Sequence, residues 1–283
     1  MKISGKIHCL RIPFKVTDKI ERFVNLYIIE GEKIYLIDCG VKGCSEIIEK
    51  YLKSINRDIS EIKAVILTHT HPDHIGGLYE LKSKSDFDLY CPKDEIDWIE
   101  NIEKQFAERP IPNFYNLVGG SVKVNNNLND GEIINFENGI SLKIYGTKGH
   151  SKDSVSIYFE EEGAVFTGDA VPNVENINMP IYISAKESIN SLLKIKSIAG
   201  IKYMLSAWDI PRIGKECYEV IETAEILLKR INKSVEKLYS KDSIQNIEEF
   251  TVRVLEESGI KNGMAIPLVQ KSIEANIKEI INL

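Results

Sequence analysis

Histidine and aspartate side chains are concentrated in one short stretch of this sequence. His69, His71, Asp73 and His74 lie within six residues, although the whole chain holds only five histidines. Imidazole nitrogens and carboxylate oxygens are the ligands from which proteins build zinc and related metal sites. A purely structural group of histidines is the alternative, but such a dense grouping of these residue types is typical of metal or catalytic sites. The stretch therefore predicts a metal centre.

The spacing of these residues indicates how they would face one ion. Residues 64–67 form an apolar run of strand character, and residues 75–81 read as the start of a helix. In an extended segment, residues two apart project to the same side, so His69 and His71 can bind one ion together. Pro72 suits a turn or a first helical position, and a helix from there would bring Asp73 and His74 back over the same hollow. The cluster is thus predicted at a strand-to-helix turn.

The segment THTHPDHIGG, residues 68–77, resembles the H-x-H-x-D-H signature of the metallo-β-lactamase superfamily. Members of that family share an αββα sandwich with one or two metal ions at its edge. The resemblance covers roughly residues 1–230 and implies an α/β fold, a four-layer αββα metallo-β-lactamase sandwich with a helical C-terminal extension. It implies a metallo-β-lactamase-like domain over residues 1–230 and the extension over residues 231–283.

Two later segments extend the resemblance. Residues 149–151 match the family's glycine-histidine step, and residues 166–169 match its F-[TS]-G-D step. The family pattern therefore implies that one metal takes three histidines, that a second takes an aspartate and a histidine, and that a further aspartate is shared. In this chain these ligands would be His69, His71 and His150 for the first metal, Asp73 and His74 for the second, and Asp169 between them.

The chain departs from the family pattern after the next strand, where a final histidine is usual. Trp208 stands there, and its indole N–H is a donor that cannot ligate a metal. The neighbouring Asp209 could supply an oxygen ligand, which would bias the second site towards iron, manganese or weakly held zinc. A turn role for Asp209 is an equally open interpretation. Trp208 could instead line the substrate pocket.

The predicted elements occur in the order that the family requires. Asp38 follows the predicted strands over 23–37. The resemblance implies that its carboxylate supports the metal ligands from behind, and a simple turn residue is the alternative. The apolar patterns predict strands over 3–12, 23–37, 132–136, 141–146, 155–160 and 164–167, and helices over 44–54, 94–108, 216–240, 248–257 and 267–281.

Residues 92–120 have a less regular pattern. A predicted helix over 94–108 is followed by Pro110 and Pro112 and then by Phe114 and Tyr115. Prolines interrupt helices, so the segment is expected to break here. It could form a lid insertion in which Tyr115 contacts substrate, or it could serve packing alone.

Composition narrows the classes of function. The formal net charge is −6 and the calculated pI is about 5.6, with lysine and glutamate interspersed. The sequence has no basic stripe of the kind that nucleic-acid-binding proteins carry, so no nucleic-acid partner is expected. No segment approaches the ~18 apolar residues of a membrane span, and the N-terminus lacks a signal-peptide pattern. Five cysteines without a C-x-x-C pair fit a reducing compartment. A soluble, cytoplasmic protein without membrane contact is expected.

The predicted function is that of a metal-dependent hydrolase. It would act on a small acyl substrate, such as a thioester, lactone or related ester, through a metal-bound hydroxide, with Asp73 orienting the nucleophile. The cofactor would be one or two zinc ions, with iron or manganese as alternatives. Glyoxalase II-like and lactonase-like enzymes share this motif and a helical tail, and a homodimer is an open option. The alternatives are a mononuclear iron oxidoreductase of persulfide-dioxygenase type and a non-catalytic sensor on a partly decayed site.

Overall fold

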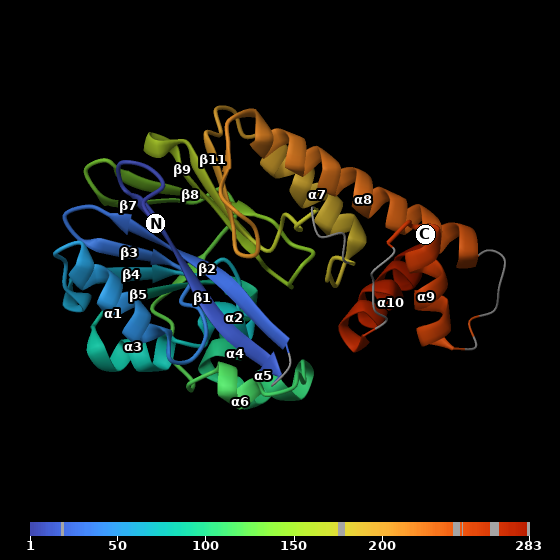
Figure 1. Ribbon diagram of the computed structural model, residues 1–283, viewed down its shortest axis with the longest axis horizontal. Helices are drawn as coiled ribbons and strands as arrows, with labels where there is room; N and C mark the ends of the chain where they lie inside the picture. The colour runs from blue at the N-terminus through green and yellow to red at the C-terminus, as the bar shows by residue number, and fades with distance from the viewer. Residues whose placement is uncertain (18–19, 175–178, 240–243, 245, 261–265, 282–283) are drawn as a thin grey trace.

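The computed structural model describes residues 1–17, 20–174, 179–239, 244, 246–260 and 266–281, and contains two six-stranded sheets (Figure 1). The first sheet has the order β1-β2-β3-β4-β5-β6. Its first three strands are antiparallel, and β3 to β6 run parallel. The bounds are β1 Ile7–Thr17, β2 Ile20–Glu30, β3 Ile34–Ile37, β4 Ile62–Ile66, β5 Asp88–Pro92 and β6 Asn126–Leu128.

The second sheet has the order β12-β11-β10-β9-β8-β7. It is antiparallel apart from the parallel pair of β10 and β11. Strands β9 and β10 are buried along their whole length, as expected of strands covered on both faces. The bounds are β7 Ile133–Glu137, β8 Ile140–Gly146, β9 Val155–Phe159, β10 Ala164–Gly168, β11 Tyr203–Ser206 and β12 Arg212–Ile213.

Apolar side chains fill three layers of core. One cluster lies between the sheets and combines residues of β1 to β4 with residues of β8 to β11. A second lies outside the first sheet, under α1 (Cys44–Ser54) and α3 (Leu78–Lys84). A third lies outside the second sheet, under α7 (Ala185–Lys196) and α8 (Lys215–Tyr239). The layers are therefore helix, sheet, sheet and helix, which is the predicted αββα sandwich.

The two sheets meet at the predicted metal turn. The backbone N–H of Val155 at the start of β9 donates to the carbonyl of Thr68, just after β4, at 2.8 Å. Gly168, at the end of β10, approaches the same threonine so closely that an added Cβ would lie 2.5 Å from its Oγ1. Only glycine fits there, and its φ of +50° is in the left-handed region. The ends of strands from both sheets thus lie side by side.

The helices predicted on either side of the site are shorter than expected. The helix predicted over 94–108 is two helices, α4 (Ile96–Glu100) and α5 (Ile102–Glu108), which follow the 3-10 turn η2 (Lys93–Glu95). The prediction of one helix was wrong because Asn101 has φ −142° and ψ 87°, and its side chain accepts a hydrogen bond from Lys104 N and so caps α5. Similarly, α2 (Pro72–Ile75) ends at the two glycines before α3.

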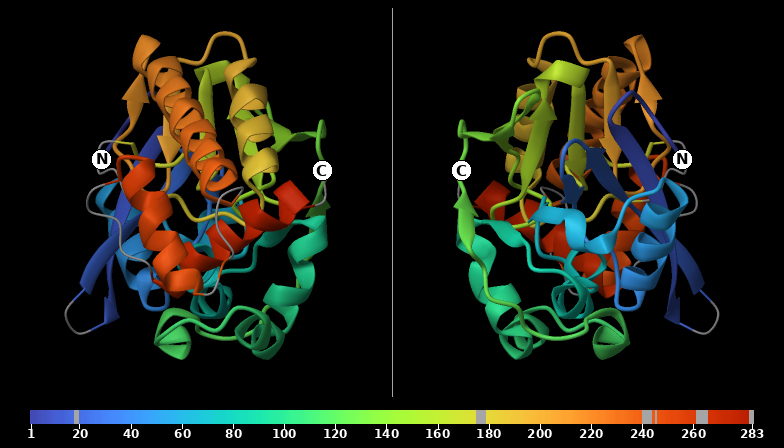
Figure 2. Two further views of the ribbon diagram at one scale, coloured as in Figure 1. Left: turned by 90° about the vertical axis from the view of Figure 1, so that its right-hand side faces the viewer. Right: turned by 90° about the vertical axis from the view of Figure 1, so that its left-hand side faces the viewer.

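The C-terminal helices pack onto the outer layer of the second sheet. Helix α8 continues through residues 230 and 231 without a break, so the predicted domain boundary lies inside a helix. Helices α9 (Ile247–Glu257) and α10 (Pro267–Ile281) share one apolar cluster with α7 and α8. Figure 2, left, shows them below α7 and α8. Among the described residues, no helix combines the length and apolar character that crossing a bilayer requires.

The remaining short elements connect these layers. They are the 3-10 turns η1 (Ile59–Glu61) and η3 (Glu160–Glu162) and the helix α6 (Phe114–Leu117). Figure 1 places α4, α5 and α6 together beside α2. The segment 92–120 that the sequence set apart therefore borders the metal turn.

Candidate metal centre

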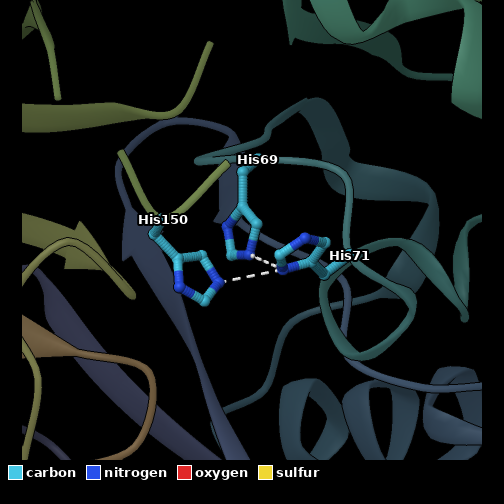
Figure 3. A group of neighbouring side chains, drawn as sticks. All are labelled: His69, His71 and His150. Atoms are coloured by element: carbon cyan, nitrogen blue, oxygen red, sulfur yellow. Dashed lines mark hydrogen bonds between the residues drawn. The ribbon is translucent and has the colours of Figure 1, made fainter. Parts of the chain in front are cut away.

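Three histidines from distant parts of the chain converge at the meeting point of the sheets (Figure 3). The Nδ1 atom of His71 lies 3.0 Å from Nε2 of His69 and 2.9 Å from Nε2 of His150. His69 and His71 are buried, and His150 is partly buried. This group can hold a metal ion, because one nitrogen of each ring lies within 4.8 Å of the others.

Hydrogen bonds on the outer side of two rings set their tautomers. His150 Nδ1 lies 2.8 Å from the carbonyl of Ile181, which can only accept, so Nδ1 carries the proton. His69 Nδ1 lies 3.1 Å from the Thr68 hydroxyl, which donates its own hydrogen to Asp38. Both rings therefore turn an unprotonated Nε2 towards the centre, as metal-binding histidines do.

A second group is built around His74. Its Nδ1 donates to Oδ2 of Asp38 at 2.8 Å, so its Nε2 is free to face the site. That Nε2 lies 3.3 Å from Oδ1 of Asp169 and 3.5 Å from Oδ2 of Asp73. All three of these atoms are buried and lack a hydrogen-bond partner among the described residues. Buried acceptors that face one another need a positive charge between them, either a proton on His74 Nε2 or a metal ion.

Asp169 connects the two groups. Its Oδ2 lies 3.2 Å from His150 Nε2, while its Oδ1 faces His74. A carboxylate with one oxygen directed to each group is able to bridge two cations. His69 likewise belongs to both groups, since its ring centroid lies 4.0 Å from that of His74. These residues are thus suited to metal ions in three respects. They offer imidazole and carboxylate donors, their tautomers direct unprotonated nitrogens inwards, and several of their buried polar atoms lack a hydrogen-bond partner among the described residues.

The charge balance of the site also favours cations. Burial lowers the pKa of His69 and of His71 well below the usual value, which keeps both rings in the neutral form that binds metals. Burial opposes a charge on His74, but Asp38, Asp169 and Asp73 raise its pKa well above the usual value. The carboxylates around this ring therefore stabilise a positive charge at Nε2, which a proton or a metal ion can supply.

Glycines allow the turns that carry the candidate ligands to pack closely against neighbouring helices. A Cβ on Gly76 would lie 1.9 Å from the carbonyl of Leu117, and one on Gly77 would lie 2.2 Å from Cys44 Sγ. Gly149, before the third histidine, has φ +123°, and a Cβ there would lie 2.4 Å from Ser188 N on α7. The nearest neighbours of the glycine pair are therefore the end of α6 and the start of α1.

Glu95 supports the site and was missed in the sequence. This buried carboxylate at the end of η2 accepts hydrogen bonds from the backbone and hydroxyl of Thr70, at 2.9 and 2.8 Å, between the two histidines of the first turn. It also accepts from Ser151 Oγ at 2.5 Å and Asp153 N at 2.8 Å, just after His150. One side chain therefore ties both histidine-bearing loops together. The run of acidic residues around it offered no signal that singled it out.

Helices α4 and α5 form a border of the site. The ring of Trp98 on α4 lies 6.4 Å from the ring of His71, centroid to centroid. On α5, the fully buried Gln105 donates from Nε2 to the carbonyl of Thr70. The segment 92–120 is therefore anchored against the metal turn, which is the position that the lid prediction requires; closure over a substrate stays a prediction.

The structure does not group Asp209 with the other candidate ligands. Its Oδ2 and Oδ1 accept from Arg212 Nε and Nη2, both at 2.9 Å, and Oδ1 also accepts from Ile210 N at 2.8 Å. The carboxylate is thus engaged in a buried ion pair within its own turn, which speaks for the turn interpretation and against a replacement for the missing histidine.

The two aromatic candidates lie in different surroundings. Trp208 packs against Phe14 and Phe23 of the first two strands, with ring centroids 6.0 and 6.4 Å away. Tyr115 is exposed and donates to Glu103 Oε2 at 2.7 Å. No ring contact joins either of them to the histidines within the described ranges, so their substrate roles stay predictions.

The chain is similar to proteins of one known family. Residues 20–205 match the model of the metallo-beta-lactamase superfamily. A probable metallo-hydrolase of Bacillus subtilis (strain 168) is 26% identical over 170 residues, which cover 58% of this chain and 71% of the relative. A hydroxyacylglutathione hydrolase of Nitrobacter hamburgensis is 27% identical over 120 residues, which cover 42% of this chain and 38% of the relative.

A solved structure shares the overall fold. A metallo-beta-lactamase family protein from Thermus thermophilus superposes with a TM-score of 0.74 at 19% identity. The match covers 99% of this chain and 94% of the other, so it includes the C-terminal helices as well as the sandwich.

Proposed function

This chain belongs to the metallo-beta-lactamase superfamily and is a metallo-hydrolase, and from that premise we propose that it hydrolyses small acyl substrates with a pair of zinc ions. Thioesters are the first choice, with lactones and related esters next. The observation that carries the proposal is the unmet set of acceptors at His74, Asp73 and Asp169 beside a complete three-histidine group. A hydroxyacylglutathione hydrolase among the relatives supports the thioester class.

In this proposal each metal has its own ligands. His69, His71 and His150 hold the first ion through the three converging nitrogens, and Asp73 and His74 hold the second, with Asp169 between the two. Zinc suits this set because it accepts imidazole and carboxylate together. The ions would supply a water of lowered pKa and would polarise the acyl carbonyl.

The chain's own residues supply orientation and proton transfer. Asp73 lies 3.5 Å from His74 Nε2, and in this proposal it would orient the attacking water and carry its proton towards the leaving group. Asp38 and Thr68 hold the rings of His74 and His69 from behind, so the ligand nitrogens keep their direction during turnover. Glu95 keeps the two histidine-bearing loops in register.

Two other functions compete with this proposal. A mononuclear iron oxidoreductase would use one ion, and the carboxylates around His74 would then be balanced only by a proton on its Nε2. A non-catalytic sensor would have no need for Asp73 beside an intact ligand set. The second group of acceptors therefore favours the two-metal hydrolase over both.

Metal removal tests the proposal. Zinc-loaded protein should hydrolyse at least one member of a panel of acyl thioesters and lactones, and removal of the metal with 1,10-phenanthroline should lower kcat by more than about 100-fold, because water activation is lost. Added zinc should restore the rate. Turnover that survives complete metal removal would contradict the proposal, and so would oxygen consumption that accompanies turnover of the substrate.

A further inference from the structure

An arginine next to the candidate metal centre has no partner among the residues that the structure describes. Arg109 follows α5, and its backbone N–H donates to the carbonyl of Gln105 at 2.8 Å, one helical turn earlier. The side chain of Gln105 reaches the carbonyl of Thr70, which lies between His69 and His71. Arg109 directly follows α5 and is bonded back to Gln105, so it lies next to the turn that carries the two histidines.

The guanidinium of Arg109 forms no ion pair and no hydrogen bond within the part of the chain that the structure describes, although its side chain is half-buried. Other shielded arginines are paired: Arg57 lies 2.7 Å from Glu61, and Arg212 lies 2.9 Å from Asp209. A guanidinium held away from water without an anion is unfavourable. A guanidinium in this position, beside the candidate metal centre, can be compensated by the anion of a bound ligand.

The acidic residues that face Arg109 are already engaged. Burial lowers the pKa of Arg109, while the negative charges of Asp73, Asp169 and Glu95 raise it. These three carboxylates are therefore the acids that interact electrostatically with the guanidinium. Glu95 is saturated by its four hydrogen bonds to the histidine-bearing loops. Asp73 and Asp169 belong to the second metal group, which would compensate their charges once loaded. Within the described ranges, no carboxylate near Arg109 is thus left to pair with it.

We propose that Arg109 is a specificity-determining residue that binds an anionic group of the substrate, away from the acyl carbon that the metals address. A guanidinium presents a planar pair of N–H donors that matches a carboxylate or a phosphoryl group in bidentate fashion. The side chain is partly exposed, so a ligand can reach it. The substrate class is therefore an acyl compound that carries a second, negatively charged end. This inference rests on the proposed acyl hydrolysis for naming the ligand a substrate.

Binding of simple diacids tests the inference without any turnover. Zinc-loaded protein is titrated calorimetrically with butyrate and with succinate, glutarate and adipate, because a monoacid can engage the metals alone, whereas a diacid of the right length also reaches Arg109. At least one diacid should bind about 10-fold more tightly than butyrate. In Arg109→Gln this preference should fall below about 3-fold, and Arg109→Lys should retain part of it.

The matched control removes a charge from an exposed position of α5, the helix that Arg109 follows. Lys104 is exposed on α5 and pairs with Asp97 at 2.7 Å, so Lys104→Gln should keep the diacid preference of the wild type. Replacing the diacid with 3-phosphonopropionate distinguishes a phosphoryl group from a carboxylate as the preferred anion. Circular dichroism checks that each variant is folded.

A wild type without diacid preference, or a preference that persists in Arg109→Gln, would overturn the inference. These outcomes are separable from failure of the proposed function. Hydrolysis of thioesters or lactones without diacid preference contradicts only the anion site, and diacid preference without any hydrolysis contradicts only the acyl hydrolase.

Discussion

His69→Ala is expected to lower kcat for acyl hydrolysis by at least about 10⁴-fold, because it removes one of the three imidazole ligands proposed for the first metal. The His69 ring lies against those of His71, His74 and His150, and its loss leaves the first group with two histidine ligands. Steady-state kinetics at saturating zinc measures the loss, and elemental mass spectrometry should show a matching fall in bound metal.

A second histidine provides the control for this variant. His8 lies in β1, away from the centre, where its ring contacts Tyr51 at 2.8 Å and Glu30 at 2.9 Å. His8→Ala should cost stability but keep kcat within about 3-fold, as expected of a substitution that touches no reacting group. Unchanged turnover in His69→Ala would exclude the assigned centre as the site of catalysis.

Asp38→Asn is expected to destabilise the metal-free protein by about 2–4 kcal/mol and to remove one metal equivalent from the loaded protein. One Asp38 oxygen accepts from Thr68 N at 2.8 Å, and the other accepts from His74 Nδ1 at 2.8 Å. An amide offers only one acceptor, so its NH₂ group would face one of these donors. His74 would then lose the support that directs its Nε2 to the second group.

The choice of asparagine keeps the backbone intact. Asp38 has φ +63°, and asparagine tolerates this left-handed conformation better than most residues. Urea denaturation of the metal-free variant measures the free energy of unfolding, and Asp86→Asn, a change at a fully exposed carboxylate, is the control. Wild-type stability together with full metal content in Asp38→Asn would show that Asp38 is not the support described here.

The candidate centre could be predicted from sequence because most of its candidate ligands lie in compact motifs at strand ends. His69, His71 and His74 lie in one turn, so local spacing alone indicated a shared ion. His150 and Asp169 lie far along the chain, and the resemblance to a known family was needed to join them to the first turn. The two sheets bring these strand ends together through the contacts of Thr68 with Val155 and Gly168.

The supporting residues could not be predicted because their roles depend on tertiary contacts. Glu95 and Arg109 are charged residues in a segment that reads as an ordinary amphipathic helix. Only the contacts of Glu95 and Gln105 with Thr70 bring this segment to the site. Asp209 was assigned two roles, and the buried arginine three residues later decides where its oxygens point. Strands β5, β6 and β12 and helix α7 were not predicted, since short or mixed apolar patterns do not separate strand from helix.

Metal content is the measurement that tests the central claim most directly. Elemental mass spectrometry of the anaerobically purified protein should give two zinc ions per chain, one for the three-histidine group and one for the group of Asp73, His74 and Asp169. One iron per chain, with no second metal taken up on titration, would contradict the two-zinc hydrolase and favour the iron oxidoreductase.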